Sequence, residues 1–134
     1  MQNEHNFYMK IAYDVAQASY CVRSKVGAII VKGGNIIAFG YNGTPAGFPN
    51  ECEDDAITLP NVLHAESNAL MKCARWGGNA EGAKLYMTMS PCFECAKLII
   101  QAGIIFIYYM EIYRQRDGLY LLGEAGIPYK QIPL

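Results

Sequence analysis

The sequence of 134 residues lacks several features that would assign it to a common class of protein. It has no excess of positive charge, because 11 basic residues oppose 12 acidic ones, whereas proteins that grip a nucleic-acid backbone are usually basic. No apolar run is long enough to span a bilayer, since glycine, lysine or polar residues interrupt each one. The first residues show no basic segment followed by an apolar stretch, as a signal peptide would. We therefore expect a cytoplasmic protein that binds neither nucleic acid nor membrane, and the charge balance suits a nucleotide better than a polymer.

The sequence also lacks the even number of cysteines that a disulfide framework needs. Five are present, at positions 21, 52, 73, 92 and 95. An odd count without an export signal argues against structural disulfides. Metal binding or ordinary burial is therefore the better interpretation of these cysteines.

What is present favours one folded domain spanning residues 1–134, because 52% of the residues are apolar and 17% are charged. Apolar spacing predicts helices over residues 4–20, 62–76, 91–103 and 115–125. Strands are expected over residues 25–31, 35–41, 84–89, 104–110 and 129–132. The first two strands form a hairpin, and the later alternation of strand and helix implies parallel strands with crossover helices. The sequence therefore predicts an α/β fold with a mixed sheet.

Particular residues mark the ends of two of these helices. Pro60-Asn61 marks the entry of the second helix, and Gly77-Gly78 marks its end. Ser90 suits the N-cap of the third helix, and Pro91 suits its first helical position. Both helices are thus expected to begin near residues that can bind a metal or transfer a proton.

Two short motifs lie at the starts of expected helices: His64-Ala65-Glu66 and Pro91-Cys92-Phe93-Glu94-Cys95. Cys92 and Cys95 are three positions apart, so they are neighbours on one helix face, where the helix dipole favours thiolates. Zinc accepts cysteine sulfur and histidine nitrogen in a tetrahedral arrangement, and three protein ligands leave one position for water. We expect His64, Cys92 and Cys95 to hold one catalytic Zn²⁺ ion, since this paired pattern is the signature of zinc deaminases.

Glu66 is the expected general acid and base. Zinc lowers the pKa of a bound water to about 7, so Glu66 can pass that proton to ring N3 while hydroxide attacks C4 of a cytosine-type base. Residues two apart do not share a helix face, so His64 and Glu66 can both reach the metal only near the end of the helix. Taken alone, Cys-x-x-Cys usually marks a structural site or two buried thiols, and His-x-Glu is a weak signal. The two motifs in this order are specific.

Segments beyond the zinc motifs extend the pattern over most of the chain, from about residue 11 to residue 113. They are Ser24-Lys25-Val26-Gly27-Ala28, Gly40-Tyr41-Asn42-Gly43-Thr44-Pro45, His64-Ala65-Glu66-Ser67-Asn68-Ala69 and Ser90-Pro91-Cys92-Phe93-Glu94-Cys95-Ala96-Lys97. Together they resemble the zinc-dependent cytidine and deoxycytidylate deaminase family, and are similar to the compact deoxycytidylate (dCMP) deaminases of phages and bacteria. The resemblance implies a three-layer α/β/α cytidine deaminase-like fold with a mixed five-stranded sheet.

The resemblance also implies an activity: zinc-dependent hydrolysis of dCMP to dUMP and ammonia, which supplies dUMP for thymidylate synthesis. Members of the family are commonly homohexamers that dCTP with Mg²⁺ activates and dTTP inhibits. Residues that match positions near the substrate and its phosphate are Arg23, Ser24, Lys25, Asn42, Asn68 and Tyr113, with Asn42 expected to hydrogen-bond the deoxyribose. Residues that match the effector site are Tyr41, Asn42, Gly43, Thr44 and Arg75.

Simpler structural roles remain open to these residues. The glycines of the loop can simply shape turns, a lone arginine is often a surface charge, and Tyr113 can be a packing residue. The same zinc motifs occur in deaminases that act on tRNA or DNA bases. A binding module without enzymatic activity would instead close its zinc with a fourth ligand such as Cys52 or Cys73.

Some dCMP deaminases resembling this sequence carry a second, structural zinc between the first helix and an insertion before the His-x-Glu motif. Here only eleven residues separate Cys52 from His64, and the other histidine is His5, so the histidines of that insertion are missing. Cys21, Cys52 and Cys73 are therefore expected to be plain thiols.

Overall fold

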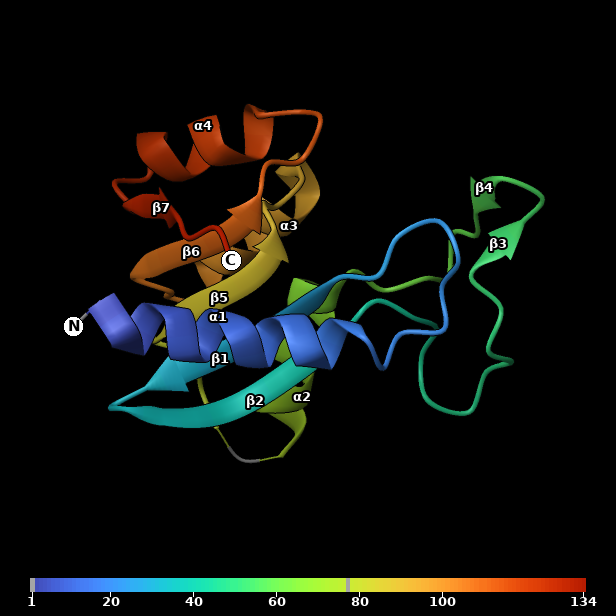
Figure 1. Ribbon diagram of the computed structural model, residues 1–134, viewed down its shortest axis with the longest axis horizontal. Helices are drawn as coiled ribbons and strands as arrows, with labels where there is room; N and C mark the ends of the chain where they lie inside the picture. Colours follow the sequence, from blue (N-terminus) through green and yellow to red (C-terminus); the bar gives the residue numbers. More distant parts are fainter. Residues whose placement is uncertain (1, 77) are drawn as a thin grey trace.

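A mixed sheet of five strands in the order β2-β1-β5-β6-β7 lies at the centre of the computed structural model, which describes residues 2–76 and 78–134 (Figure 1). The strands are β1 Gly27–Lys32, β2 Asn35–Tyr41, β5 Lys84–Met89, β6 Phe106–Glu111 and β7 Tyr129–Gln131. β1 pairs antiparallel with β2 and β5, whereas β6 pairs parallel with β5 and β7. The predicted mixed five-stranded sheet is confirmed.

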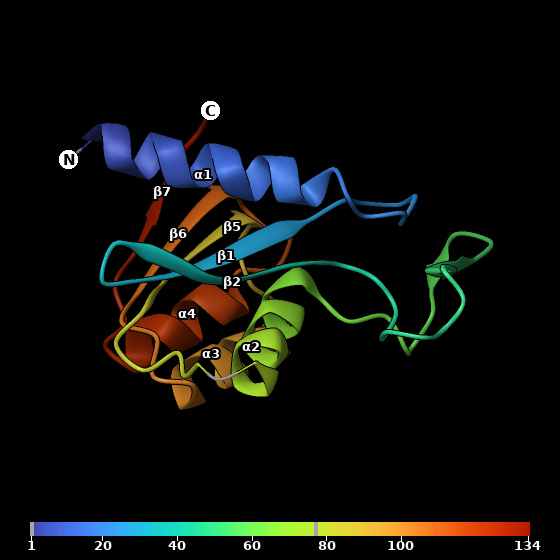
Figure 2. The ribbon, with the colours of Figure 1, turned by 90° about the horizontal axis from the view of Figure 1, so that it is seen from below.

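Four helices of the described chain cover the two faces of this sheet: α1 Gln2–Ala16, α2 Ala65–Arg75, α3 Phe93–Gln101 and α4 Asp117–Glu124. α1 lies on one face, and α2, α3 and α4 lie together on the other (Figure 2). Each face has its own cluster of buried side chains. The α/β/α layering implied by the resemblance is therefore present. Within the described residues, no helix is long and apolar enough to cross a membrane.

The interior strands are buried on both faces because helices cover each side of the sheet. On the α1 side the core is aromatic: Tyr108 stacks on Tyr86 with ring centroids 4.6 Å apart, and on His5 at 4.4 Å. Tyr86 is fully buried, and its hydroxyl is 2.7 Å from Nδ1 of His5. That hydrogen bond offsets the cost of burying the phenol. α1 is thus held to the sheet by packing and by part-buried hydrogen bonds, since the hydroxyl of Tyr8 also donates to the backbone oxygen of Gly34 at 3.1 Å.

α2 begins later than its sequence predicts. Leu63 forms an antiparallel bridge with Gly43, so the chain stays extended up to His64, which is the N-cap of α2. The entry predicted at Pro60-Asn61 therefore lies before the helix. Trp76 is the C-cap of α2, and Gly77, predicted with Gly78 to end this helix, lies outside the described residues.

α3 also begins later, and its N-cap is not Ser90. The N-cap is Cys92, whose sulfur accepts a hydrogen bond from the backbone N–H of Cys95 at 3.5 Å. The hydroxyl of Ser90 is buried and instead accepts from the backbone N–H of Tyr113 at 2.7 Å. Pro91 therefore precedes the helix. Both chemical motifs open helices, as the sequence predicts, but with their first metal-ligand candidate at the N-cap.

Residues 43–63 form an arm that leaves the sheet after β2 and returns at α2 (Figure 1). Its ends are joined by the bridge between Gly43 and Leu63. Within the arm, β3 Glu53–Asp54 and β4 Ile57–Thr58 form a small hairpin that the sequence does not predict. The hairpin turns at Asp55, which has a positive φ of 56°.

The expectation of plain thiols is wrong for two of the three cysteines. Cys21 and Cys52 form a disulfide, with Cα atoms 5.3 Å apart, whereas Cys73 is free and buried in α2. α1 ends at Ala16 rather than near residue 20, and the irregular segment that follows brings Cys21 to the middle of the arm. An odd number of cysteines does not exclude a disulfide, because the three other cysteines are free.

Two glycines allow the helices of the motifs to pack closely. A Cβ on Gly40 of β2 would lie 2.5 Å from the backbone N of Ala69 in α2. A Cβ on Gly118 of α4 would clash with the backbone carbonyl oxygen of Pro91, which directly precedes Cys92. Gly123 is also in α4, and a Cβ there would meet only one side-chain atom, at 4.0 Å.

We expect Gly118→Ala to destabilise the protein by about 1–3 kcal/mol, because overpacking against backbone outweighs the gain in helix propensity. Gly123→Ala is the matched control and should stabilise by up to about 1 kcal/mol, since nothing obstructs the added methyl group. Urea unfolding of both variants measures the change. Equal midpoints for the two variants would contradict the close approach of α4 to Cys92.

Candidate active site

His64, Cys92 and Cys95 meet where the N-termini of α2 and α3 converge. Nδ1 of His64 lies 3.5 Å from Sγ of Cys92 and 3.3 Å from Sγ of Cys95. Zn–N bonds of about 2.0–2.1 Å and Zn–S bonds of about 2.3 Å require N···S separations of about 3.5 Å in a tetrahedral site. The donor set and its spacing therefore fit a zinc ion, with one coordination position left for water.

The N-cap position of His64 explains how it shares a site with Glu66. His64 has extended backbone angles (φ −73°, ψ 157°), so it lies outside the regular helix, whereas Glu66 is in the first turn of α2. Both side chains line the same cavity. The restriction that residues two apart do not share a helix face is thus avoided at the helix end.

The two sulfurs share one negative charge. The pKa of Cys92 is lowered to about 4, first because Cys95 donates a hydrogen bond to it and further because of His64. The pKa of Cys95 is raised, chiefly because its proton is held by Cys92. The pKa of His64 is raised mainly by its hydrogen bond with Cys92. A divalent cation would replace these shared protons and be bound by both thiolates.

Glu66 is the buried carboxyl group of the site, with 4% of its surface exposed. Desolvation raises its pKa to about 7, against opposing effects of a backbone hydrogen bond and of His64. A carboxyl group with a pKa near the working pH can both accept and donate a proton. This is the property that a general acid and base needs.

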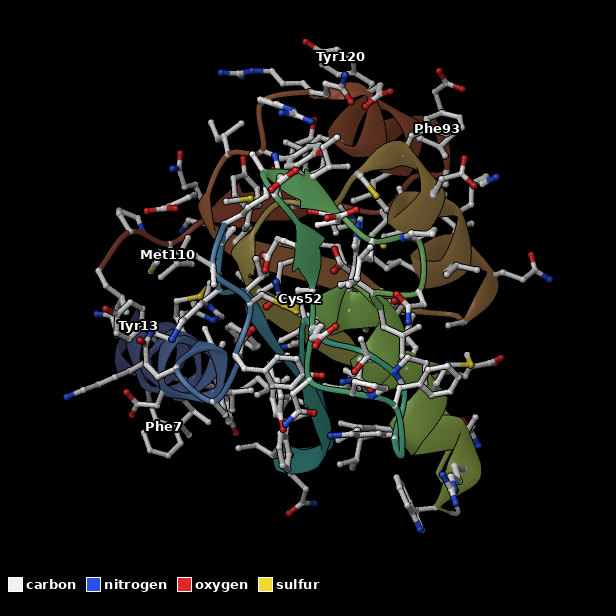
Figure 3. The ribbon with its side chains drawn as sticks, turned by 90° about the vertical axis from the view of Figure 1, so that its right-hand side faces the viewer. Phe7, Tyr13, Cys52, Phe93, Met110 and Tyr120 are labelled. Atoms are coloured by element: carbon white, nitrogen blue, oxygen red, sulfur yellow. A yellow bond between two sulfur atoms is a disulfide. The ribbon has the colours of Figure 1, made fainter. Side chains whose placement is uncertain are left out.

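A cavity of about 330 Å³ opens in front of these groups, a size typical of small-molecule sites. Its walls come from the residue after β2, the start of α2, the end of β5, the N-cap of α3, the segments after α1 and after β6, and the arm. The cavity lies at the C-terminal ends of the parallel strands β5 and β6, where ligands bind in open α/β sheets. Figure 3 looks onto this end of the molecule, with Cys52 of the arm near its centre.

Comparison with known proteins identifies the family. The family model described as the cytidine and deoxycytidylate deaminase zinc-binding region matches residues 2–111. The chain belongs to this family.

Solved and curated relatives agree with this membership. A crystal structure of dCMP deaminase from the cyanophage S-TIM5, in complex with dCMP and dUMP, is 47% identical and superposes with a TM-score of 0.92 over 95% of each chain. The deoxycytidylate deaminase of Enterobacteria phage T4 is 35% identical over 93% of this chain and 88% of its own length. ComE operon protein 2 of Bacillus subtilis (strain 168) is 36% identical over 97% of this chain and 71% of its own length.

Four of the residues matched to the family's substrate site line the cavity, namely Arg23, Ser24, Asn42 and Tyr113. The amide of Asn42 is engaged with the backbone, because its Oδ1 accepts from Val26 N at 2.9 Å and its Nδ2 donates to Ser24 O at 2.8 Å. Asn42 therefore holds the 24–26 segment against the cavity.

Two of the matched residues are elsewhere. Lys25 is exposed and does not line the cavity. Asn68 donates to the backbone oxygen of Tyr41 at 2.9 Å and lines a second cavity instead. Asn68 is turned away because it lies on a different face of α2 from Glu66, two positions earlier.

The second cavity, of about 360 Å³, brings together most of the residues matched to the effector site. Tyr41, Gly43, Thr44 and Arg75 line it, whereas Asn42 lines the first cavity. Lys72 lies 5.4 Å above the Tyr41 ring, and Arg75 lies 4.8 Å above the ring of Trp76. This cavity therefore offers two cations beside two aromatic rings.

Sequence reasoning missed several residues of the first cavity, among them Arg114, Glu53 and Thr58. Arg114 had a usable signal: it follows Tyr113, just beyond a predicted strand in the parallel part of the sheet. Glu53 and Thr58 had none, because they reach the cavity only through the folding of the arm.

Proposed function

We propose that this protein hydrolyses dCMP to dUMP and ammonia, using a zinc ion held by His64, Cys92 and Cys95. The observation that carries the proposal is the buried carboxyl group of Glu66, which lines one cavity with His64 and Cys92. Similarity to a cyanophage structure that contains dCMP and dUMP supports dCMP as the substrate. The product would supply thymidylate synthesis.

Glu66 performs the proton transfers of this reaction. Bound zinc would supply water acidic enough to attack at neutral pH. Glu66 takes the proton of that water and delivers it to ring N3 as the new C4–O bond forms. It then takes the proton of the new C4 hydroxyl and gives it to the exocyclic nitrogen, so that the C4=O bond forms, the C4–N bond breaks and ammonia leaves. Burial of Glu66 excludes bulk water that would compete for these protons.

Two arginines explain why the substrate should be a nucleotide rather than a nucleoside. Arg23 and Arg114 line the cavity from two separate segments, one after α1 and one after β6, and both are exposed. A guanidinium group binds a phosphate dianion through paired hydrogen bonds. Ser24 adds a hydroxyl donor beside Arg23.

Glu66→Gln should lower kcat for dCMP by at least about 100-fold, because the amide cannot transfer the protons. It should keep one zinc per chain, since the proposed ligands are unchanged. Cys95→Ser should lose both zinc and activity, whereas Cys73→Ser should keep both. Steady-state kinetics and metal analysis of the three purified variants measure this. Full activity of Glu66→Gln would exclude Glu66 as the acid and base.

Arg114→Gln should raise KM for dCMP by about 5- to 10-fold, a modest effect because the site is open to solvent. Its kcat/KM for deoxycytidine, which lacks the phosphate, should stay within about twofold. Arg116→Gln is the matched control, because Arg116 is exposed nearby but does not line the cavity. An equal loss of kcat/KM for dCMP and for deoxycytidine would count against phosphate binding by Arg114.

We further propose that the second cavity binds the effectors dCTP, with Mg²⁺, and dTTP, and that the active form is a homohexamer. Aromatic rings can stack on a base, and Lys72 and Arg75 can neutralise a triphosphate.

In the native protein, dCTP with Mg²⁺ should raise the rate at low dCMP. Arg75→Gln should require about 10-fold more dCTP for half-maximal activation, as expected for losing one charged contact. Lys97→Gln is the control, because Lys97 is exposed on α3 and pairs with Glu94 away from this cavity. If dCTP does not change the deamination rate of the native protein, regulation at this site is refuted.

A further inference from the structure

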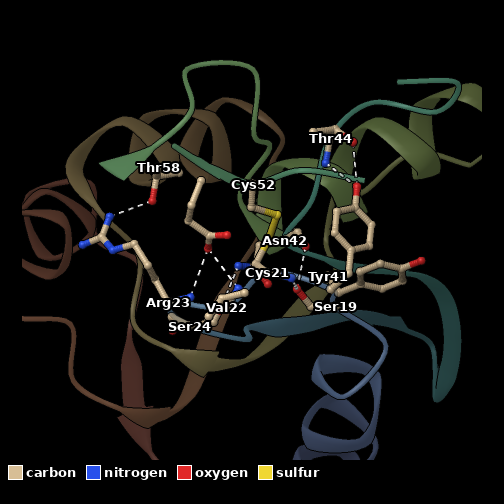
Figure 4. Close-up of a disulfide and its surroundings, with 12 residues drawn as sticks. Ser19, Cys21, Val22, Arg23, Ser24, Tyr41, Asn42, Thr44, Cys52 and Thr58 are labelled. Atoms are coloured by element: carbon tan, nitrogen blue, oxygen red, sulfur yellow. Dashed lines mark hydrogen bonds between the residues drawn. A yellow bond between two sulfur atoms is a disulfide. The ribbon is translucent and has the colours of Figure 1, made fainter. Parts of the chain in front are cut away.

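The disulfide joins the arm to the segment after α1 beside the proposed substrate site. Cys21 and Cys52 both line the first cavity, and their bond ties residues 19–24 to the middle of the arm, directly before β3 (Figure 4). The arm also joins the rest of the chain through its two ends, which meet at Gly43 and Leu63, and through Thr44, whose N–H and hydroxyl contact the hydroxyl of Tyr20. The bond holds the middle of the arm, around residue 52, beside the cavity.

Glu53, the residue after Cys52, continues this attachment. Its Oε2 accepts hydrogen bonds from two successive backbone N–H groups, those of Val22 at 2.9 Å and Arg23 at 3.0 Å. A carboxylate that accepts two N–H bonds holds a short segment in one conformation. The disulfide places this carboxylate, because Cys52 and Glu53 are adjacent.

The arm also holds the side chain of Arg23. Its Nη1 donates to Oγ1 of Thr58 in β4 at 2.7 Å (Figure 4). Arg23 is therefore fixed at its backbone by Glu53 and at its guanidinium group by Thr58, although it is exposed. An unrestrained arginine on a surface loop would lose more conformational entropy when it binds an anion.

We propose that the Cys21–Cys52 disulfide and Glu53 form a staple that positions Arg23 for the substrate phosphate, and that reduction of the disulfide releases it. This rests on the proposed dCMP deamination. Reduction by a dithiol transfers two electrons and two protons to the sulfurs: the S–S bond breaks, two thiols form, and the dithiol becomes a cyclic disulfide. The chain thus carries a redox-sensitive control of nucleotide preference.

The charge of Glu53 can be separated from its hydrogen bonding by substitution. Glu53→Ala removes the acceptor, so the ratio of kcat/KM for dCMP to that for deoxycytidine should fall about 10-fold through KM, with kcat within about twofold. Glu53→Gln keeps an acceptor oxygen and should preserve the ratio. Glu51→Ala, an exposed carboxylate of the same arm, is the control. If Glu53→Ala keeps the ratio, or lowers kcat/KM equally for both substrates, Glu53 is not a positioning residue.

Reduction of the native protein tests the disulfide. A phosphine is used with excess Zn²⁺, because a dithiol would also bind zinc; it consumes one water and yields a phosphine oxide and two thiols. Mass spectrometry verifies the reduction. The reduced protein should show the same loss of ratio as Glu53→Ala, and Cys73→Ser should respond in the same way. The Cys21→Ser, Cys52→Ser double variant should have the lowered ratio and be indifferent to phosphine.

Some results would overturn the proposal. One is an unchanged ratio of kcat/KM values after verified reduction. Another is a count of five free thiols in the air-oxidised, zinc-free, unfolded protein. A third is a second zinc per chain bound by Cys21, Cys52 and Glu53, whose ligand atoms also lie within 4.8 Å of one another.

A native protein that does not deaminate dCMP would instead refute the proposed function. The staple would then be tested by hydrogen exchange: reduction should raise exchange in the arm and in residues 19–24, and unchanged exchange would refute the staple itself.

Discussion

The approach of two helix N-termini to within metal-ligand distance is the constraint on which the rest of the structure depends. His64 caps α2, and Cys92 caps α3, and their ligand atoms must lie about 3.5 Å apart to bind one zinc ion. The sheet meets this requirement because β2 packs under α2 through Gly40, and α4 packs against the start of α3 through Gly118. Small residues at these contacts have a positional purpose that their burial alone would not reveal.

The same convergence concentrates negative charge in a buried place. Desolvation raises the pKa of Glu66, and the hydrogen bond with Cys92 together with desolvation raises the pKa of Cys95; the negative charge of Cys92 adds to both shifts. A divalent cation removes this conflict, because it favours both thiolates and the carboxylate at once. Metal binding and folding should therefore be coupled in this protein, with the cation stabilising an arrangement that charge repulsion opposes.

The two halves of the cavity are built differently. The half that contains His64, Glu66 and Cys92 is formed by the N-terminal ends of α2 and α3, which pack on the sheet. The half proposed to bind phosphate is formed by the segment after α1, the segment after β6, and the arm. Loops are mobile unless other contacts restrain them. The hydrogen bonds of Glu53 and the disulfide supply that restraint, so they matter for substrate preference more than for chemistry.

Local spacing in the sequence determined the helices and the hairpin, because each of these depends on neighbours a few positions apart. The sequence also indicated the mixed sheet through the order of these elements, and the residues that fit zinc through two short motifs at expected helix starts. It predicted His64, Glu66, Cys92 and Cys95 together, and the structure brings His64 and the two cysteines within ligand distance. Only the tertiary structure decided the disulfide, the turning of Asn68 toward a second cavity, and the presence of Arg114, Glu53 and Thr58 at the first. These depend on where α1 ends and how the arm folds back. These arrangements bring together residues from distant parts of the sequence, over which periodicity carries no information.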